Sequence, residues 1–482
     1  MRLYVIFRYV GFVILLNSLF LLVSTLISFF YHETSFVPLL YSTIITILFG
    51  IFPIIFVPPI DDINHIEGLL IVVSSWLLSV LIGTIPYVMW GGEFSFTNAI
   101  FESVSGYTTT GSTILNQIES LPAGILFWRA STHWIGGMGI IVFVLSVMPS
   151  LGSAGLVLYR SEMSPAALRQ FKMRSRDAVR IILWVYVGLT AIETILLMFA
   201  GMNLFDAITQ AFSTVATGGF STKNTSIAAF HSLAVEIIIM VFMLLSGMNF
   251  ALLFAAVTGK LEEVKASTVL KYYVGANIVV ILLVAINLWG HNYTSFWQAL
   301  RYSSFQVLSV GTSTGFANAD SSIWPPFAQM LLVIMTLQCA SAGSTSGGIK
   351  VDRVVVFLKS VVRKIKQTLH PNAVLNIIMD GKKLDEDLVN STILYIITYV
   401  VIVAISGLLV SAMGVDMISA YSGAAATMGN VGPGLGFLGS LGNYSSLPDA
   451  AKWVYSFTMI LGRLEIYGLI IFLLPSTWRR KA

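Results

Sequence analysis

The sequence predicts an all-α integral membrane protein. Four helix–pore-helix–filter–helix repeats are expected in a pseudo-fourfold arrangement around one pore, after an extra N-terminal helix pair. Hydrophobic residues make up 56% of the 482 positions and charged residues 10%, against about 25% charged in soluble domains. Apolar runs repeatedly reach the roughly 20 residues that cross a bilayer. Between them, segments rich in threonine, serine and glycine recur roughly every hundred residues, as in a repeat protein.

About ten helices are predicted to span the membrane. The first two lie within residues 1–62, and the other eight form pairs in repeats at 63–150, 151–260, 261–366 and 367–482, with cytoplasmic loops opening the second and fourth. Their length and apolar composition indicate helices. The candidate spans are Leu3–Phe30, Val37–Val57, Gly68–Trp90, Ala123–Pro149, Ile181–Ala200, Leu233–Thr258, Val269–Leu288, Phe327–Leu358, Leu388–Met413 and Ala450–Leu474.

Each pair encloses a stretch that is too short and too mixed in polarity to span. Four half-length pore helices are therefore expected, at Thr97–Tyr107, Leu204–Val215, Phe296–Val310 and Met417–Met428. A filter segment follows each one. Irregular backbone is tolerated in a bilayer only where protein buries it or where it lines a watery cavity, so we expect the filter segments to meet on one axis. They are Thr108-Thr109-Thr110-Gly111, Ala216-Thr217-Gly218-Gly219, Thr312-Ser313-Thr314-Gly315 and Gly429-Asn430-Val431-Gly432.

The distribution of charge predicts the orientation. Basic residues lie between repeats and at the C-terminus, whereas acidic residues flank the filter segments. The positive-inside rule places both termini in the cytoplasm, so the filters open outward, where acidic residues would concentrate cations. The basic residues include Arg160, Arg169, Lys172, Arg174, Arg176, Arg180, Lys350, Arg353, Lys359, Arg363, Lys364, Lys366, Lys382 and Lys383. The acidic residues are Glu93, Glu102, Glu119, Asp206, Asp320, Asp416 and Asp449.

The filter segments have the composition of a site for a dehydrated potassium ion. Such an ion loses its water only where oxygens replace it, and main-chain carbonyls do so without adding fixed charge. Glycine permits backbone angles at which a Cβ atom would collide, so successive carbonyls can face inward. Pore helices that direct their C-termini at the axis would add partial negative charge. Potassium is therefore the metal ion expected at the filter.

These motifs resemble those of the Trk/Ktr/HKT superfamily of cation transporters over nearly the whole chain. The likeness includes Ser105-Gly106-Tyr107 before the first filter segment, Gly219-Phe220 and Gly315-Phe316. It implies potassium-selective translocation across the bacterial inner membrane and a homodimer with one pore per protomer. Glycine at the end of all four segments implies potassium preference. The fourth segment has no threonine, and the channel-like Thr-Val-Gly-Tyr-Gly pattern is missing, which predicts looser discrimination against sodium.

The last helix of the third repeat is predicted to be interrupted between Gln338 and Gly348. Glycine and small hydroxylated residues do not hold a straight helix reliably. The family resemblance implies an intramembrane loop that gates the pore beneath the filter. The alternative is a kinked helix whose small residues pack closely against a neighbour. The gate residues would be Ser341, Ala342, Gly343, Ser344, Thr345, Ser346, Gly347 and Gly348.

Arg463 lies in the middle of the final predicted span, where a cation costs about 3 kcal/mol or more. The resemblance implies that Arg463 projects into the pore, contacts the gate and slows cations. The alternative is a buried ion pair, although Glu465, two residues further on, points elsewhere on a helix. Arg129 and His133 share one helix face, where a packing or interfacial role is expected.

Enzyme activity is not expected, because no nucleophile with a base and no paired carboxylates lie near a plausible pocket. The pattern Gly434–Gly439 matches G-x-G-x-x-G but lacks its β-α-β context, so no organic cofactor is expected on this chain. The resemblance implies a cytosolic nucleotide-binding regulatory ring of the TrkA type, and the basic loops would also meet anionic lipids. The net charge of +4 does not indicate nucleic acid. The alternative function is a proton- or sodium-coupled cation symporter with alternating access.

Overall fold

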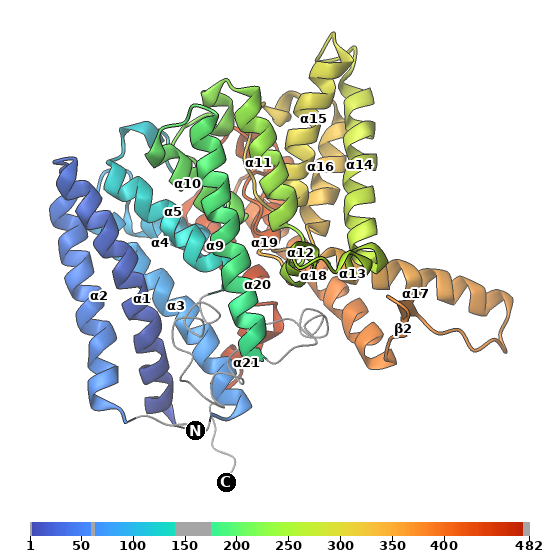
Figure 1. Ribbon diagram of the computed structural model, residues 1–482, viewed down its shortest axis with the longest axis horizontal. Helices are drawn as coiled ribbons and strands as arrows, with labels where there is room; N and C mark the ends of the chain where they lie inside the picture. The colour runs from blue at the N-terminus through green and yellow to red at the C-terminus, as the bar shows by residue number, and fades with distance from the viewer. Residues whose placement is uncertain (1, 59–62, 140–174, 476–482) are drawn as a thin grey trace.

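The computed structural model describes residues 2–58, 63–139 and 175–475, and it is built almost entirely of helices (Figure 1). Within these residues, six helices are long and apolar enough to cross a membrane, or up to eight if each of two bent pairs is one span. The six are α1 (Leu3–Phe30), α2 (Phe36–Phe56), α3 (His65–Trp90), α9 (Ser175–Phe199), α14 (Thr268–Leu288) and α18 (Glu386–Ala412).

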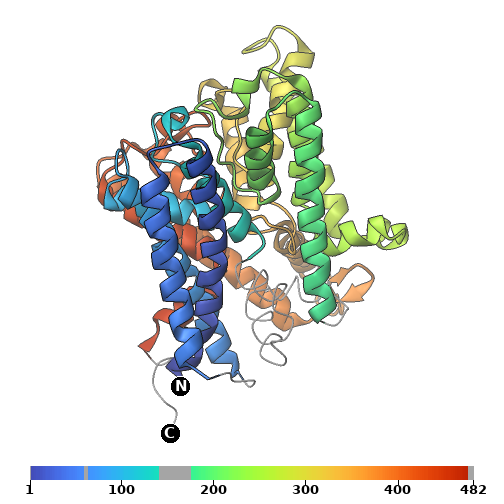
Figure 2. The same ribbon diagram turned by 60° about the vertical axis from the view of Figure 1, so that its left-hand side comes forward.

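The N-terminal pair, α1 and α2, packs through small and polar residues and exposes its large apolar ones. The hydroxyls of Thr25 and Thr43 lie 3.0 Å apart in the buried seam, while Phe49 and Ile55 of α2 are 66% and 68% exposed. Small residues allow close helix contact in a bilayer, where burying apolar groups gives no driving force. Figure 2 shows this pair standing along one side of the molecule.

Four short helices lie where the half-length pore helices were expected: α4 (Phe96–Tyr107), α10 (Leu204–Val215), α15 (Phe296–Gly311) and α19 (Met417–Gly429). Three begin at a side-chain cap. The Asn203 side chain accepts from the Asp206 N–H at 2.8 Å, Asp416 accepts from Ser419 at 2.9 Å, and Ser95 caps α4 in the same way. Such caps satisfy main-chain donors that a helix start leaves free.

The second helix of each repeat stops or bends near the depth of the filter segments. Helix α5 (Ala123–Gly137) ends early, and the rest of that predicted span lies beyond the described residues. Helix α11 (Leu233–Ser246) meets α12 (Phe250–Val257) at 107°, and α20 (Asp449–Arg463) meets α21 (Tyr467–Leu473) at 114°.

Only the break between α16 (Pro326–Gln338) and α17 (Val351–Leu369) was predicted, so the prediction of straight spans in the second and fourth repeats is wrong. The breaks have local causes. Asn249 caps the new helix α12 by accepting from the Ala251 N–H at 2.8 Å. After α20, Glu465 and Ile466 take φ values of 54° and 49°, which a helix does not allow.

The smaller elements are α13 (Leu261–Ala266), a two-stranded antiparallel hairpin beside α17, and four 3-10 turns. The hairpin, β1 (Ile378–Met379) and β2 (Lys382–Lys383), was not predicted. Its connecting Asp380 and Gly381 both have positive φ, as Asp-Gly hairpin turns require. The 3-10 turns are η1 (Ile118–Ser120), η2 (Ser226–Phe230), η3 (Ser321–Ile323) and η4 (Gly436–Leu438).

We expect Gly11→Leu to destabilise the α1–α2 pair. A Cβ atom at Gly11 would lie 2.8 Å from the carbonyl oxygen of Gly50 in α2, and overpacking of this kind costs about 1–3 kcal/mol. Thermal unfolding of the detergent-solubilised protein measures the effect. The matched control is Gly188→Leu on α9, where an added Cβ meets nothing within 4 Å. Equal unfolding temperatures for the two variants would contradict the close packing.

Candidate ion-conduction site

Each filter segment ends its pore helix with the same backbone turn. The second residue of each segment is left-handed, with φ of 53° at Thr109 and Thr217, 60° at Ser313 and 52° at Asn430. The N–H group of this second residue donates to the carbonyl oxygen three residues earlier. The N–H group of the third residue donates to the carbonyl oxygen five residues before it. This pattern is a Schellman motif. Left-handed angles are strained for a β-branched threonine, so the surrounding structure imposes the turn.

The turn leaves main-chain carbonyl oxygens without partners. Because the N–H and C=O groups of a trans peptide point in opposite directions, the bonded N–H group of the third residue turns the carbonyl of the second residue, which belongs to the same peptide, away from the helix. Across the described ranges, no hydrogen bond ends on the carbonyl oxygens of the second and third residues of any segment. These residues are Thr109, Thr110, Thr217, Gly218, Ser313, Thr314, Asn430 and Val431.

The four filter segments form a closed ring. A Cβ atom built on the final glycine of each segment would collide with a carbonyl oxygen of the next segment, and the fourth segment returns to the first. All four glycines also have positive φ, between 79° and 97°, so no other residue fits without strain. The distances from the built Cβ atom to the carbonyl oxygen are 2.1 Å from Gly111 to Gly218, 2.1 Å from Gly219 to Thr314, 2.0 Å from Gly315 to Val431 and 2.6 Å from Gly432 to Thr110.

One cavity of about 60 Å³, which we call the vestibule, is lined by all four final glycines. The structure therefore brings together the four segments that the sequence placed far apart in the chain. The segments after the ring are also fastened to one another. The Ser112 hydroxyl and the Tyr444 hydroxyl both donate to the carbonyl oxygen of Gly432, at 3.1 and 2.7 Å.

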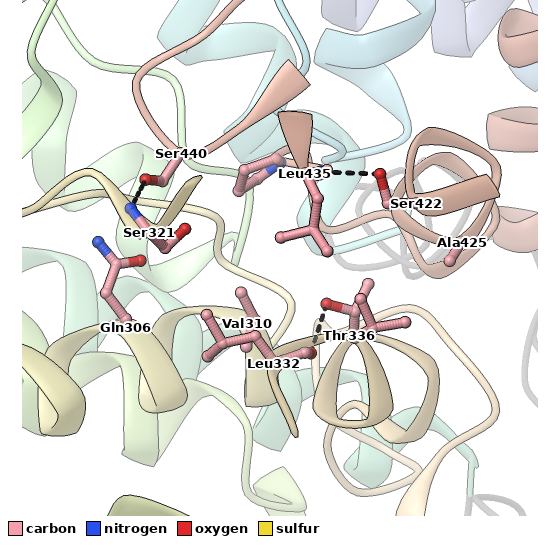
Figure 3. Close-up of a pocket in the computed structure, with 12 residues that line it drawn as sticks. Gln306, Val310, Ser321, Leu332, Thr336, Ser422, Ala425, Leu435 and Ser440 are labelled. Atoms are coloured by element: carbon pink, nitrogen blue, oxygen red, sulfur yellow. Dashed lines mark hydrogen bonds between the residues drawn. The ribbon is translucent and has the colours of Figure 1, made fainter. Parts of the chain in front are cut away.

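A second, smaller cavity lies behind the third and fourth segments, between α15, α16 and α19 (Figure 3). Its volume is about 20 Å³, which suffices for about one water molecule. The hydroxyl of Ser440 accepts from the Ser321 N–H at 2.9 Å, and the hydroxyl of Ser422 accepts from Leu435 at 2.8 Å. The first bond ties the chain that follows the fourth filter segment to the third repeat, and the second ties it to its own pore helix α19, so the cavity is part of the filter's support.

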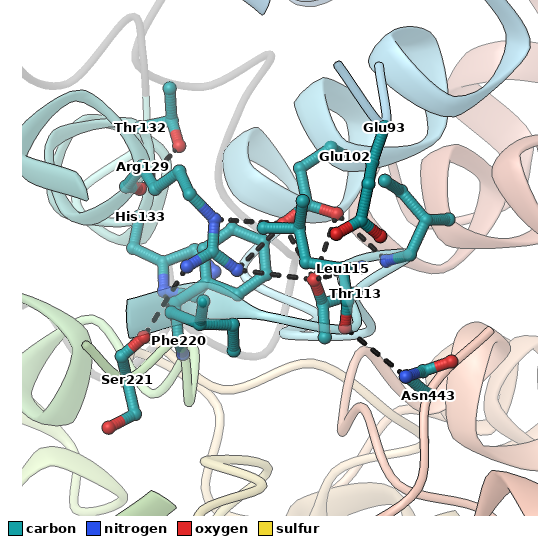
Figure 4. A network of polar contacts seen from close by, with 12 residues as sticks. Glu93, Glu102, Thr113, Leu115, Arg129, Thr132, His133, Phe220, Ser221 and Asn443 are labelled. Atoms are coloured by element: carbon teal, nitrogen blue, oxygen red, sulfur yellow. Dashed lines mark hydrogen bonds and ion pairs between the residues drawn. The ribbon is translucent and has the colours of Figure 1, made fainter. Parts of the chain in front are cut away.

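A buried ion pair supports the first two filter segments (Figure 4). Arg129 binds Glu102 at 2.7 Å, and their side chains are 1% and 0% exposed. Glu102 also accepts from the Ile114 N–H at 3.0 Å, which holds the chain that leaves the first segment. The ring of Phe220 lies 4.0 Å from the Arg129 guanidinium and stacks on His133 at 4.1 Å. The expected packing role of Arg129 and His133 is confirmed, whereas the pairing with Glu102 was not predicted.

The acidic residues that flank the filter segments were expected to concentrate cations outside, and the structure gives several of them structural partners. None of the seven acidic residues singled out from the sequence lines the vestibule. Glu102 is neutralised by Arg129, and Asp206 and Asp416 serve at the starts of α10 and α19. The Asp206 carboxylate also accepts from the Thr222 hydroxyl at 2.6 Å. Their position at helix starts was readable from the sequence, because aspartate is a common capping residue.

The interruption predicted in the third repeat is confirmed. Residues 339–350, which we call the α16–α17 loop, are not helical, so the alternative of a kinked continuous helix does not hold. The loop lies against the inner ends of the filter segments, opposite the vestibule. The Gly347 N–H donates to the Ser313 hydroxyl at 3.1 Å, and the Thr345 hydroxyl donates to the carbonyl of Val215 at 3.0 Å. A Cβ atom at Gly347 would lie 2.6 Å from the carbonyl oxygen of Gly429.

Arg463 fastens this loop to the first repeat. Its guanidinium donates to the carbonyl oxygen of Thr345 in the loop at 2.7 Å, and to those of Gly136 and Gly137 at the end of α5 at 2.5 and 3.2 Å. Arg463 is the last residue of α20, and it lies at the bend between α20 and α21, in the middle of the predicted final span. The prediction that Glu465 does not pair with Arg463 agrees with these contacts.

Glu465 instead forms ion pairs with two basic residues at the start of α17. The Nζ atom of Lys350 lies 3.2 Å from Oε1 of Glu465, and the Arg353 guanidinium binds the other oxygen. The turn that follows Arg463 is therefore connected to the helix that follows the loop.

Comparison with known proteins identifies the family. A family model described as "TrkH: Cation transport protein" matches residues 59–479. The chain belongs to the TrkH family of cation transport proteins. It is 37% identical over 423 residues to the Trk system potassium uptake protein TrkH of Escherichia coli K12, with 87% of each protein covered. It is 33% identical to TrkH of Halomonas elongata, with 100% of each covered.

The crystal structure of the potassium transporter TrkH from Vibrio parahaemolyticus matches with a TM-score of 0.88 and 33% identity, covering 99% of this chain and 100% of that one. The resemblance inferred from the filter motifs is confirmed, and so is the all-α membrane fold. With its several apolar spans, the chain is a multi-pass membrane protein.

We expect Glu102→Gln to destabilise the protein by about 3–5 kcal/mol, because the substitution leaves the buried Arg129 without its counter-charge. Replacing both residues, by Glu102→Leu with Arg129→Met, removes both buried charges and should cost less. Thermal unfolding of purified protein in detergent compares the two. A double variant less stable than the single one would show that the ion pair itself, and not the unpaired charge, determines the stability.

Proposed function

We propose that the chain conducts potassium ions into the cell across the bacterial inner membrane. The observation that carries this proposal is the closed ring of four filter segments. Each segment has two main-chain oxygens that accept no hydrogen bond from the residues that the structure describes. An ion would reach the ring from the vestibule and exchange its water for these oxygens. The relatives' names, as potassium uptake proteins, support potassium as the ion.

The α16–α17 loop and Arg463 would close the inner side of the ring. The loop contacts the ends of three pore helices or filter segments, and Arg463 adds a positive charge at the same level. A cation leaving the ring would meet this charge before it met water. Opening therefore requires the loop and Arg463 to move together, and their bond through Thr345 supports such a coupled motion.

A cytosolic nucleotide-binding ring of the TrkA type is the proposed regulator, and α17 is the element through which it would act. Helix α17 continues directly from the loop, and its first turn is tied to the α20–α21 turn through Glu465. The relatives' description as part of a Trk system supports a partner subunit. We also propose that the chain forms a homodimer and that its basic residues contact anionic lipids.

The proposed orientation places both termini and α17 in the cytoplasm. Figure 1 shows the beginning of α1 and helix α21 near the lower end of the view, with α17 below α14. Lys359, Lys364 and Lys366 lie on α17, and Lys382 and Lys383 lie on the hairpin beside it. Basic residues of this kind favour the cytoplasmic side, so the vestibule would face outward.

A proton-coupled symporter is the second candidate, and one observation favours it. Glu193 in α9 is fully buried, with the Thr214 side chain as its neighbouring hydrogen-bonding group. A buried carboxyl group inside a membrane protein is a plausible proton relay. Potassium flux in liposomes that drives no proton movement would exclude this candidate.

We expect Gly111→Ser to increase sodium permeability relative to potassium. The new Cβ atom would lie 2.1 Å from the carbonyl oxygen of Gly218, so adjacent segments must separate and the ring must loosen. Reversal potentials in planar bilayers with potassium on one side and sodium on the other measure the ratio. Gly188→Ser, in open space on α9, is the control. An unchanged reversal potential for Gly111→Ser would contradict the assignment of the filter.

We expect Arg463→Ala to conduct potassium several-fold faster with most of its selectivity kept, since the barrier charge is lost while the ring is intact. Rubidium uptake into liposomes measures the rate. Arg8→Ala serves as the control, because Arg8 binds main-chain carbonyls between α1 and α2, remote from the ring. Flux equal to that of the unmodified protein would remove Arg463 from the barrier.

A further inference from the structure

The vestibule has an unexpected charge. Two ionisable side chains line it, Arg129 and Lys223, and both are basic. Arg129 is neutralised by its contact with Glu102. Lys223 is half-buried, and within residues 2–58, 63–139 and 175–475 it forms no ion pair. A lysine that forms no ion pair among the described residues therefore lies at the mouth of a ring that we propose to conduct cations.

The main chain around Lys223 fixes its position. The Lys223 N–H donates to the Ser221 hydroxyl at 3.1 Å, and that hydroxyl accepts from the Gln210 side chain of α10 at 2.8 Å. The N–H of the next residue, Asn224, lies 3.3 Å from the Glu119 carboxylate, and the Asn224 side chain accepts from the Ile118 N–H at 2.7 Å. Lys223 thus follows the second filter segment on a chain that is held to both the pore helix and the first repeat.

The acidic residues nearby lie outside the cavity. Glu93, Asp206 and Glu119 keep their charge, because the groups that bind them, on Asn116, Thr222 and Asn224, are neutral. None of them lines the cavity. A narrow cavity with low-dielectric walls strengthens the field of any charge within it, so Lys223 acts on an approaching cation more strongly than a residue on an open surface.

We propose that Lys223 limits the rate at which cations reach the filter, by repelling them electrostatically in the vestibule. This inference rests on the proposed conduction through the four-segment ring. Under this proposal, Lys223 sets the rate of ion capture at low external potassium. The preference among ions is still determined by the four-segment ring. Since the effect is electrostatic, it must weaken as salt is added.

Initial rates of rubidium uptake into liposomes, measured against external rubidium at low ionic strength, test the proposal. Lys223→Gln should lower the half-saturating concentration about two- to fivefold, the scale of one charge acting over a few ångströms through water, and the maximal rate should not change. Lys223→Glu should lower it further. Lys223→Arg, which keeps the charge, should behave like the unmodified protein, and so should Lys271→Gln on the exposed start of α14.

Addition of an impermeant salt at about 0.15 M, where charges are screened over about 8 Å, should remove most of the difference. The proposal is overturned if Lys223→Gln matches the unmodified protein at low ionic strength, if Lys223→Arg shows the same change as Lys223→Gln, or if the effect does not respond to salt. Failure of the proposed function looks different, because then the unmodified protein itself would take up no rubidium.

Discussion

A carbonyl oxygen inside a bilayer must be satisfied by protein, water or an ion, and eight such oxygens in the filter segments accept no hydrogen bond from the residues that the structure describes. The second residue of each segment is left-handed, and the N–H group of the third bonds to the pore helix, which turns the carbonyl of the second residue away from that helix. The protein keeps this strained turn at four places and closes the segments into one ring. The pore helices, the glycines and the buried ion pair of Arg129 all serve to hold it.

The two ends of the ring are treated differently. One end opens into a vestibule lined by the four final glycines. The opposite end is covered by the α16–α17 loop, which Arg463 binds to the first repeat. The breaks in the second helices make this asymmetry possible. Helix α20 ends at Arg463 and α16 ends at Gln338, so in both repeats the chain stops being helical at the level where the filter segments end.

The sequence was sufficient for the periodic parts of this structure. Apolar runs predicted the long helices, short stretches of mixed polarity predicted the pore helices, and the recurring glycines predicted the ring. Local composition also revealed the α16–α17 loop, because glycine and hydroxylated residues persist there from Gln338 to Gly348. The bends after Ser246 and Arg463 were missed, since apolar residues continue on both sides and a single Asn249 or a left-handed Glu465 gives almost no signal.

Charges were harder to place than helices. The pairing of Glu102 with Arg129 joins residues 27 positions apart on different helices, and no local pattern indicates it. Acidic residues near the filters were predicted from composition, which reports the side that a residue occupies and not where its side chain points. Asp206 and Asp416 serve helix starts instead, and the vestibule receives Lys223.

Anomalous X-ray scattering from crystals grown with thallium, a monovalent cation close to potassium in size, tests the central claim most directly. A peak is expected on the axis of the ring, within coordination distance of the free carbonyl oxygens of all four segments, and it should disappear when sodium replaces thallium. Anomalous density found only away from the ring, or carbonyls that coordinate from a single segment, would contradict the account.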